Sequence, residues 1–134
     1  MKNFLVIALI ILLSVIIIAT RLFQVEYKTL EDLEKLFNKH NITYTSKPIE
    51  DEYLLDIAKE QRIYEVEEND IYVYIVDKAD LEKADYRVSN EILGNNFIVT
   101  TSSSSFIFAY TEKNLEKFEG DLFSVINEII ESEK

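Results

Sequence analysis

The sequence predicts an α+β protein: an N-terminal transmembrane helix, then two helices and a four-stranded antiparallel sheet built from two tandem ββα units. Three observations lead to this class. Residues 4–18 are apolar at every position except Ser14. Residues 30–58 carry apolar side chains at helical spacing. From residue 62 onward, a pattern of strand, turn, strand and helix occurs twice.

Residues 1–23 are expected to form a transmembrane anchor. A helix rises about 1.5 Å per residue, so the segment from Phe4 to Phe23 would cross a hydrocarbon core of about 30 Å. The alternative is a cleaved secretory signal. Cleavage after Ala19 would place Ile17 where a small residue is required. We therefore expect an uncleaved, single-pass signal-anchor in the cell membrane.

The orientation of this anchor stays open between two arguments. One cation, Lys2, precedes the apolar run, and four follow it within a short distance: Arg21, Lys28, Lys35 and Lys39. That count favours a cytoplasmic C-terminus. A very short tail with one lysine is, however, typical of a bacterial export signal, whose tail stays inside. We expect residues 24–134 to form an extracytoplasmic acidic domain.

Composition narrows the class of partner. The chain has 14 basic and 25 acidic residues, a formal net charge of −11, and no cysteine. A nucleic acid is excluded as a partner because no basic stripe is present to neutralise phosphates. Solubility is the favoured explanation of the acidity, and electrostatic steering of a basic protein partner is the alternative. The absence of cysteine excludes thiolate chemistry and every cysteine-based metal site.

Two helices are expected between residues 29 and 58. Thr29 is a candidate N-cap for the first, with a buried stripe formed by Leu30, Leu33, Leu36 and Phe37. Asn41 fits a left-handed residue after the helix, and Ile42–Thr45 alternates like a short strand. Pro48 is expected to begin the second helix, with these residues facing inward: Tyr53, Leu54, Ile57 and Ala58.

The two ββα units are expected at residues 62–92 and 96–126. A shift of 34 positions aligns Tyr72–Val76 with Phe106–Tyr110, and Leu81–Lys83 with Leu115–Lys117. We expect the units to pair into one sheet with their helices on one face, and Gly120 to kink or break the last helix. The alternative to a duplication is that binary patterning alone generates the likeness.

Candidate binding residues come from the tyrosines of the first unit. Both central strands are apolar at nearly every position, so both of their faces should be at least partly covered. With helices on one face, Tyr64, Tyr72 and Tyr74 would lie on an exposed sheet face and could form a recognition surface. Core packing is the favoured interpretation of the strand aromatics as a group, and the recognition surface is the functional alternative.

Side chains for catalysis are sparse. His40 is the only histidine and falls in the last turn of the first expected helix, where a cap role is favoured. A run of acidic residues resembles a Ca²⁺ loop but lacks a glycine and is interpreted as a solvated hairpin tip: Glu65, Glu67, Glu68 and Asp70. We therefore assign no catalytic residue, no metal ligand and no cofactor.

The leading functional hypothesis is a membrane-anchored, non-enzymatic protein-interaction or inhibitor-like module. Its basis is the acidity, the aromatic strands and the scarcity of catalytic side chains. Two alternatives stay open. One is a carboxylate-based hydrolase or Ca²⁺-dependent binding domain. The other is an accessory subunit of a membrane complex, whose anchor helix would also pack against another membrane protein.

Overall fold

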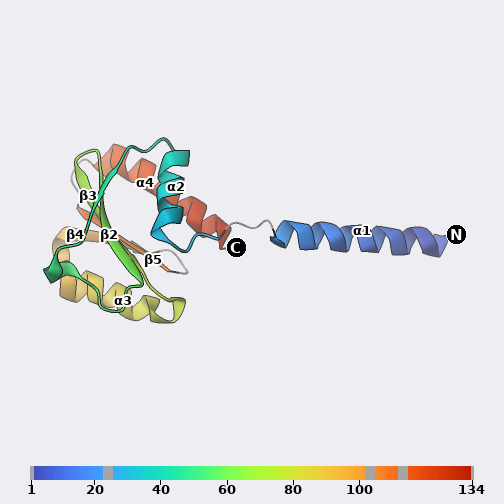
Figure 1. The fold of residues 1–134 in the computed structure, drawn as a ribbon, viewed down its shortest axis with the longest axis horizontal. Helices are drawn as coiled ribbons and strands as arrows, with labels where there is room; N and C mark the ends of the chain where they lie inside the picture. The colour runs from blue at the N-terminus through green and yellow to red at the C-terminus, as the bar shows by residue number, and fades with distance from the viewer. Residues whose placement is uncertain (1, 23–25, 102–104, 112–114, 134) are drawn as a thin grey trace.

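The computed structural model describes residues 2–22, 26–101, 105–111 and 115–133 (Figure 1). Over these residues the chain is α+β, with four α-helices and a five-stranded antiparallel sheet. The helices are α1 (Lys2–Leu22), α2 (Leu30–Lys39), α3 (Leu81–Arg87) and α4 (Leu115–Ser132). The strands are β1 (Thr45–Lys47), β2 (Glu60–Val66), β3 (Asn69–Ile75), β4 (Phe97–Thr101) and β5 (Phe106–Thr111).

Helix α1 stands apart from the sheet and its helices (Figure 1). Its large apolar side chains from Phe4 to Ile18 are all more than half exposed, around the whole circumference of the helix. Over the residues that the structure describes, no helix meets the length and hydropathy required to cross a membrane.

Helix α2 begins and ends as the sequence predicts. The Thr29 side chain accepts a hydrogen bond from the Asp32 amide, and the Asp32 carboxylate accepts one from the Thr29 amide, which makes a complete capping box. His40 is the C-cap, and Asn41 has a φ of 57°, the left-handed conformation expected there. Leu33, Leu36 and Phe37 are buried, so the predicted apolar stripe is confirmed.

The sheet has the strand order β1-β2-β3-β5-β4, and every neighbouring pair is antiparallel. The prediction of four strands was therefore one short, because Thr45–Lys47 pairs with β2 as an additional edge strand. That strand begins where the predicted one, Ile42–Thr45, was expected to end. Ile42 instead enters the core beside α2.

The helices cover both faces of the sheet, so the prediction of helices on one face was wrong (Figure 1). Helices α2 and α4 pack with Val73 and Phe108 on one face. Helix α3 packs with Tyr72 and Ile107 on the other. Every residue of β3 from Ile71 to Ile75 and of β5 from Phe106 to Tyr110 is buried, which confirms the expected cover of both faces.

The two ββα units share their order of elements but have opposite hands. Each unit can be viewed with its own helix toward the reader and its second strand pointing up. In this view the first strand lies to one side of the second strand in one unit and to the other side in the other unit. No rotation superposes two units of opposite hand. This geometry favours patterning over duplication as the origin of the sequence likeness.

The second helix predicted after Pro48 is absent, and only the single 3₁₀ turn Asp51–Tyr53 forms there. The reason is competition from β2. The Gln61 side chain accepts a hydrogen bond from the Leu55 amide at 2.8 Å and donates one to the Leu55 carbonyl at 3.2 Å. Ile49 and Leu55 enter the core on the α3 face, while Leu54, expected to face inward, is exposed. Extended packing therefore replaces helical hydrogen bonding in this segment.

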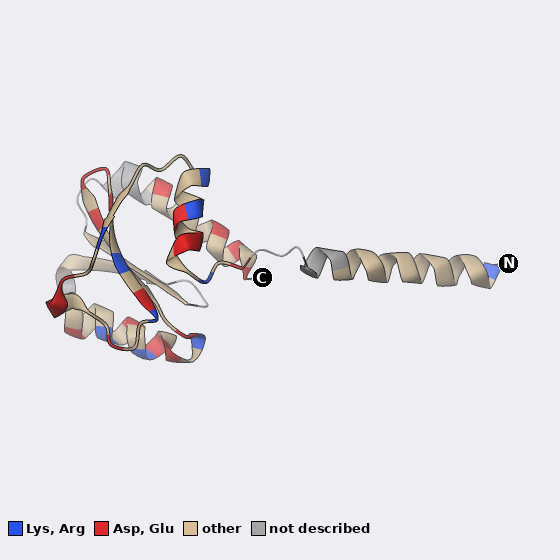
Figure 2. Cartoon of the chain, viewed as in Figure 1, with Lys and Arg blue, Asp and Glu red and all other residues tan. Residues whose placement is uncertain are grey.

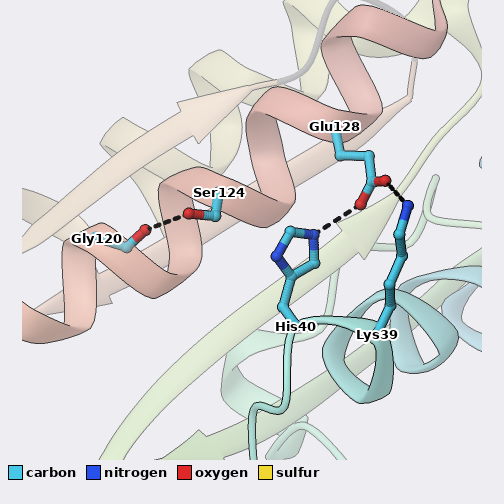
Figure 3. A network of polar contacts seen from close by, with 5 residues as sticks. All are labelled: Lys39, His40, Gly120, Ser124 and Glu128. Atoms are coloured by element: carbon cyan, nitrogen blue, oxygen red, sulfur yellow. Dashed lines mark hydrogen bonds and ion pairs between the residues drawn. The ribbon is translucent and has the colours of Figure 1, made fainter.

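Helix α4 passes through Gly120 without the predicted break. The Ser124 hydroxyl donates to the Gly120 carbonyl at 2.9 Å, four residues earlier on the same helix (Figure 3). Leu122, Val125, Ile126 and Ile129 are buried against the sheet. This packing of the turns after Gly120 outweighs the cost of one glycine, about 1 kcal/mol.

We expect Phe108→Ala to lower the free energy of unfolding by about 3–5 kcal/mol, because it removes a fully buried ring from the central strand β5. The ring also stacks with Phe106 at a centroid distance of 5.7 Å. Urea unfolding of the full chain in detergent, followed by circular dichroism, measures the change. Tyr86→Ala, at a side chain 61% exposed, is the control and should change stability by at most about 0.5 kcal/mol.

Candidate functional site

The three tyrosines predicted on an exposed sheet face are buried, so their predicted exposure was wrong. Tyr64 and Tyr74 are 0% exposed and Tyr72 is 7% exposed, because Tyr64 lies under α2 and the other two under α3 and residues 49–58. The Tyr64 hydroxyl donates to Glu34 Oε1 at 2.9 Å, and the Tyr74 hydroxyl donates to the Tyr53 carbonyl at 2.8 Å. These two rings are core residues whose polar tips are satisfied.

Tyr72 differs because it lies beside a group of acidic residues. Its ring makes edge-on contacts with Tyr53 and Phe97, at centroid distances of 5.8 and 5.5 Å. Burial, followed by the negative charges of Glu50 and Asp70, raises the pKa of Tyr72 to about 12. The shift is thus mainly an effect of burial, to which the neighbouring carboxylates add.

A surface depression of about 250 Å³ opens next to Tyr72, and we call its lining the acidic shelf. The lining residues are Glu65, Glu68, Asn69, Asp70, Tyr72, Phe97 and Thr111. The strand register explains why they meet. Glu65 pairs with Asp70, and Phe97 pairs with Thr111. Because Ile71 pairs with Tyr110, the next residues along these two antiparallel strands, Asp70 and Thr111, are also neighbours. One row of neighbours thus crosses four strands.

This row lies where the apolar cover of the α3 face ends. The buried cluster on that face includes Ile63, Tyr72 and Ala109, which form the preceding row of side chains that point to the α3 face. The next row is polar apart from Phe97 and stays open. The shelf therefore combines an aromatic side, formed by Tyr72 and Phe97, with carboxylates that water still reaches.

The β2–β3 turn holds acidic residues in a strained conformation. Val66 pairs with Asn69, so Glu67 and Glu68 form a two-residue loop, with φ values of 50° and 67°. Two positive φ values are typical of a type I′ turn, where Asn-Gly is the favoured sequence. Glutamate in the left-handed region costs about 1–2 kcal/mol per residue. Strain of this kind is found at functional sites more often than elsewhere, which favours a role for these carboxylates.

The shelf is short of positive charge (Figure 2). Lys47 Nζ lies 3.4 Å from Asp70 Oδ2, and both side chains are partly exposed to solvent. Within the described ranges, neither Glu65 nor Glu68 makes an ion pair. Asn69 is 3% exposed, and its Nδ2 donates to the Glu67 carbonyl at 3.0 Å, while its Oδ1 has no hydrogen-bond partner in the described part of the chain. Acceptors thus outnumber donors at this site.

The carboxylates and rings of the shelf are groups that can bind a cation. Carboxylates accept charge-assisted hydrogen bonds from ammonium and guanidinium groups, and ring faces attract the same cations. No group of three or more histidine, aspartate or glutamate side chains within the described residues is arranged to hold a metal ion. The shelf fits the side chain of a lysine or arginine.

His40 takes part in a separate contact that joins α2 to α4. Its Nε2 lies 2.7 Å from Glu128 Oε2, and Lys39 donates to Glu128 Oε1 (Figure 3). These hydrogen bonds, first from Lys39 and then from His40, hold the pKa of the Glu128 carboxyl below its usual value. Since His40 lies at a helix end and pairs with a carboxylate, the contact is a clamp between helices, in keeping with the cap role expected from the sequence.

The sequence contains the members of the acidic shelf but does not show that they meet. The acidic run from Glu65 to Asp70 was recognised as a hairpin tip, and the turn at Glu67 and Glu68 confirms it. Phe97 and Thr111 lie far along the chain and join this tip only through the pairing of β5 with β3. The alternation of side chains along paired strands is the one sequence signal that could have predicted the position of Phe97 and Thr111 beside this tip.

We expect Glu128→Gln to lower stability near neutral pH and to lose that effect in acid. A carboxyl group whose pKa is depressed by folding stabilises the fold above its ordinary pKa, 4.5 for glutamate, and loses this contribution as the pH falls through the folded value. Urea midpoints of wild type and variant should therefore differ most above about pH 5 and converge toward about pH 3. For the control variant Glu82→Gln, at an exposed position of α3, the difference in urea midpoint from wild type should not change with pH. A difference for Glu128→Gln that does not change with pH would contradict the clamp.

Comparisons with known proteins add no assignment to this geometry. No family model, no curated protein and no solved structure matches the chain. Function is therefore argued from the acidic shelf and from the placement of the elements around it.

Proposed function

We propose that the chain is a membrane-anchored, non-enzymatic interaction module that binds a basic segment of a partner protein at the acidic shelf. The observation that carries the proposal is the meeting of unpaired carboxylates, Glu65 and Glu68, with the aromatic side formed by Tyr72 and Phe97. Acidity alone would support only solubility. A strained acidic turn beside aromatic rings supports recognition of a cation.

The energetics favour a modest, salt-dependent affinity. An exposed ion pair contributes about 0–1 kcal/mol, and a cation over an aromatic ring about 0.5–2 kcal/mol. The net charge of −11 adds long-range attraction for a basic partner and speeds its association. One cationic side chain on the shelf is thus too weak for stable binding, and additional contacts along the same segment are needed.

We further propose that the segment from Phe4 to Phe23 holds this module at the cell membrane, with residues 24–134 on the extracytoplasmic side. Support comes from the apolar side chains of α1, which are exposed around the whole helix from Phe4 to Ile18. A helix that is apolar on every side is stable when it is buried in a protein core or in lipid. Because the domain is acidic, anionic headgroups repel it, which leaves its shelf open to a partner.

We expect Glu65→Gln/Glu68→Gln to weaken binding of a lysine-containing peptide at least threefold, because both carboxylates are exposed and lack an ion pair within the described residues. Fluorescence anisotropy of a labelled peptide with the full chain in detergent measures the affinity. The matched control is Asp80→Asn/Glu82→Gln, which removes the same charge at the far end of β3, where α3 begins. Equal weakening by both variants would show general charge attraction and contradict a site at the shelf.

Removal of residues 2–22 should transfer the protein from the membrane fraction to the soluble fraction, because it deletes the apolar helix and leaves the sheet and its helices intact. Alkaline carbonate extraction followed by blotting measures the distribution. A full-length chain with Ser14→Leu is the control and should stay in the membrane fraction. Recovery of the wild-type chain in the carbonate supernatant would overturn the anchor.

A further inference from the structure

Strand β4 is an edge of the sheet, and the strand register shows which of its backbone groups face outward. Among the described strands it pairs only with β5. The Val76 amide donates to the Ser105 carbonyl, one step beyond the Ile75–Phe106 pair of β3 and β5. Backbone groups alternate in direction along an antiparallel strand, so every second residue of β5 from Phe106 onward bonds to β4 instead of β3. The residues of β4 opposite these bond inward, and those between them face outward.

The outward backbone groups of β4 belong to Phe97, Val99 and Thr101. The Phe97 amide is already used, because it donates to the Gly94 carbonyl of the preceding 3₁₀ turn. In the described part of the chain, neither Val99 nor Thr101 makes a backbone hydrogen bond outside the sheet. Both residues are half-buried. The open part of this edge is therefore short and extends from Val99 to Thr101.

This part of the chain lacks the charges that normally protect a sheet edge. Residues 94–111, which contain β4 and β5, have no charged side chain, although 29% of the whole chain is charged. They form the longest uncharged run after residue 26. The opposite edge, β1, is only three residues long and ends at Lys47. Short length and a lysine both hinder strand addition, so β4 is the edge at which another strand can add.

We propose that a second copy of this chain adds at β4, antiparallel to it and about a two-fold axis at Thr100, so that two copies share one continuous sheet. Val99 of each copy then pairs with Thr101 of the other, and each such pair exchanges both of its N–H···O=C bonds. This register uses the outward groups of both residues and does not need the Phe97 amide. An axis at Val99 would need that amide, so the blocked end of the edge selects the register.

The length and the neutrality of the open edge favour a second copy over a flexible segment of another protein. A free segment must lose conformational entropy to become a strand, and so short an edge offers few backbone hydrogen bonds in return. In a second copy β4 is already ordered by its pairing with β5, and its outward groups match those of the first copy under a two-fold axis. The side chains of Thr100 from the two copies would also lie directly opposite each other, which is a favourable cross-strand pair.

The negative charge of each copy does not oppose this pairing strongly, because the acidic shelf lies away from β4. In the shared sheet, β3 of one copy would lie five strand spacings, about 24 Å, from β3 of the other. Salt screens charges at this separation, since the Debye length is about 8 Å at physiological ionic strength. The dimer therefore leaves both shelves separate and does not depend on what they bind.

The symmetry of the dimer also agrees with a membrane anchor at each N-terminus. A two-fold axis perpendicular to the sheet keeps the layer formed by α2 and α4 on the same side in both copies. Tyr27 and Leu30, where the chain enters α2, pack against the core on this face. The two N-terminal segments thus reach the shared sheet from one side.

A single introduced thiol tests the register, because the chain has no cysteine. Thr100→Cys would place two thiols in a non-hydrogen-bonded pair whose Cα atoms lie about 4.5 Å apart, within the range of a disulfide. The full chain is oxidised in its membranes with copper phenanthroline and run on a non-reducing gel. The matched control is Ser46→Cys, at an exposed position of the other edge strand. Thr100→Cys should give at least ten times the yield of disulfide-linked dimer that the control gives.

Sedimentation velocity of the full chain in detergent measures the strength of the dimer. Thr100→Lys brings two ammonium groups together at the axis and should raise the dissociation constant of the dimer at least tenfold. Ser46→Lys, which adds the same charge at β1, should change that constant less than threefold. Circular dichroism checks that both lysine variants are folded.

Equal yields from Thr100→Cys and Ser46→Cys would show random collision of chains and overturn pairing at β4. A dimer that Thr100→Lys leaves intact would be held by another surface, such as α1, and would overturn it as well. If detergent leaves the chain monomeric, or if Thr100→Lys fails to fold, the yields of the two cysteine variants in the membrane decide. Binding of a lysine-containing peptide by the Thr100→Lys variant should match wild type, because the proposed shelf lies on other strands.

Discussion

The central pair of strands, β3 and β5, dictates the rest of the architecture. Their paired segments, Ile71–Ile75 and Phe106–Tyr110, are buried at every position, so neither face can be left to water. One layer of helices is therefore insufficient, and the chain covers one face with α2 and α4 and the other with α3. The extended segment after Pro48 completes the cover of the α3 face. Burial of both faces is thus the constraint from which the three-layer arrangement follows.

The same constraint explains which parts of the fold the sequence could predict. Caps and periodicity are local, so the Thr29 capping box, the left-handed Asn41 and the buried stripe of α2 were recognised correctly. Which face of the sheet each helix covers is not determined by local sequence. A strand that is apolar on both sides has no periodicity to indicate where its helix packs, and Tyr72 was placed in solvent for that reason. Similarly, the helix expected after Pro48 was lost to a hydrogen-bonding side chain, Gln61, that follows it in the chain.

The candidate site arises where this cover stops. The α3 face is apolar as far as the row that contains Tyr72, and the next row exposes Glu65, Asp70 and Thr111 beside the ring of Phe97. A sheet end of this kind is normally a solvated edge with no special chemistry. Here the turn beyond it keeps two glutamates at positive φ, where Asn-Gly would fold with less strain. The cost of these two residues is appreciable against a total stability of only about 5–15 kcal/mol for a domain.

The position of the shelf restricts how a partner could approach it. Its carboxylates lie on β2, β3 and the turn between them, while Phe97 and Thr111 border it from β4 and β5. The proposed basic segment would therefore approach this end of the sheet from the α3 side. Attachment of the same chain to a membrane would restrict this encounter to partners at that surface. Local concentration would then compensate for the weak affinity that few ion pairs can provide.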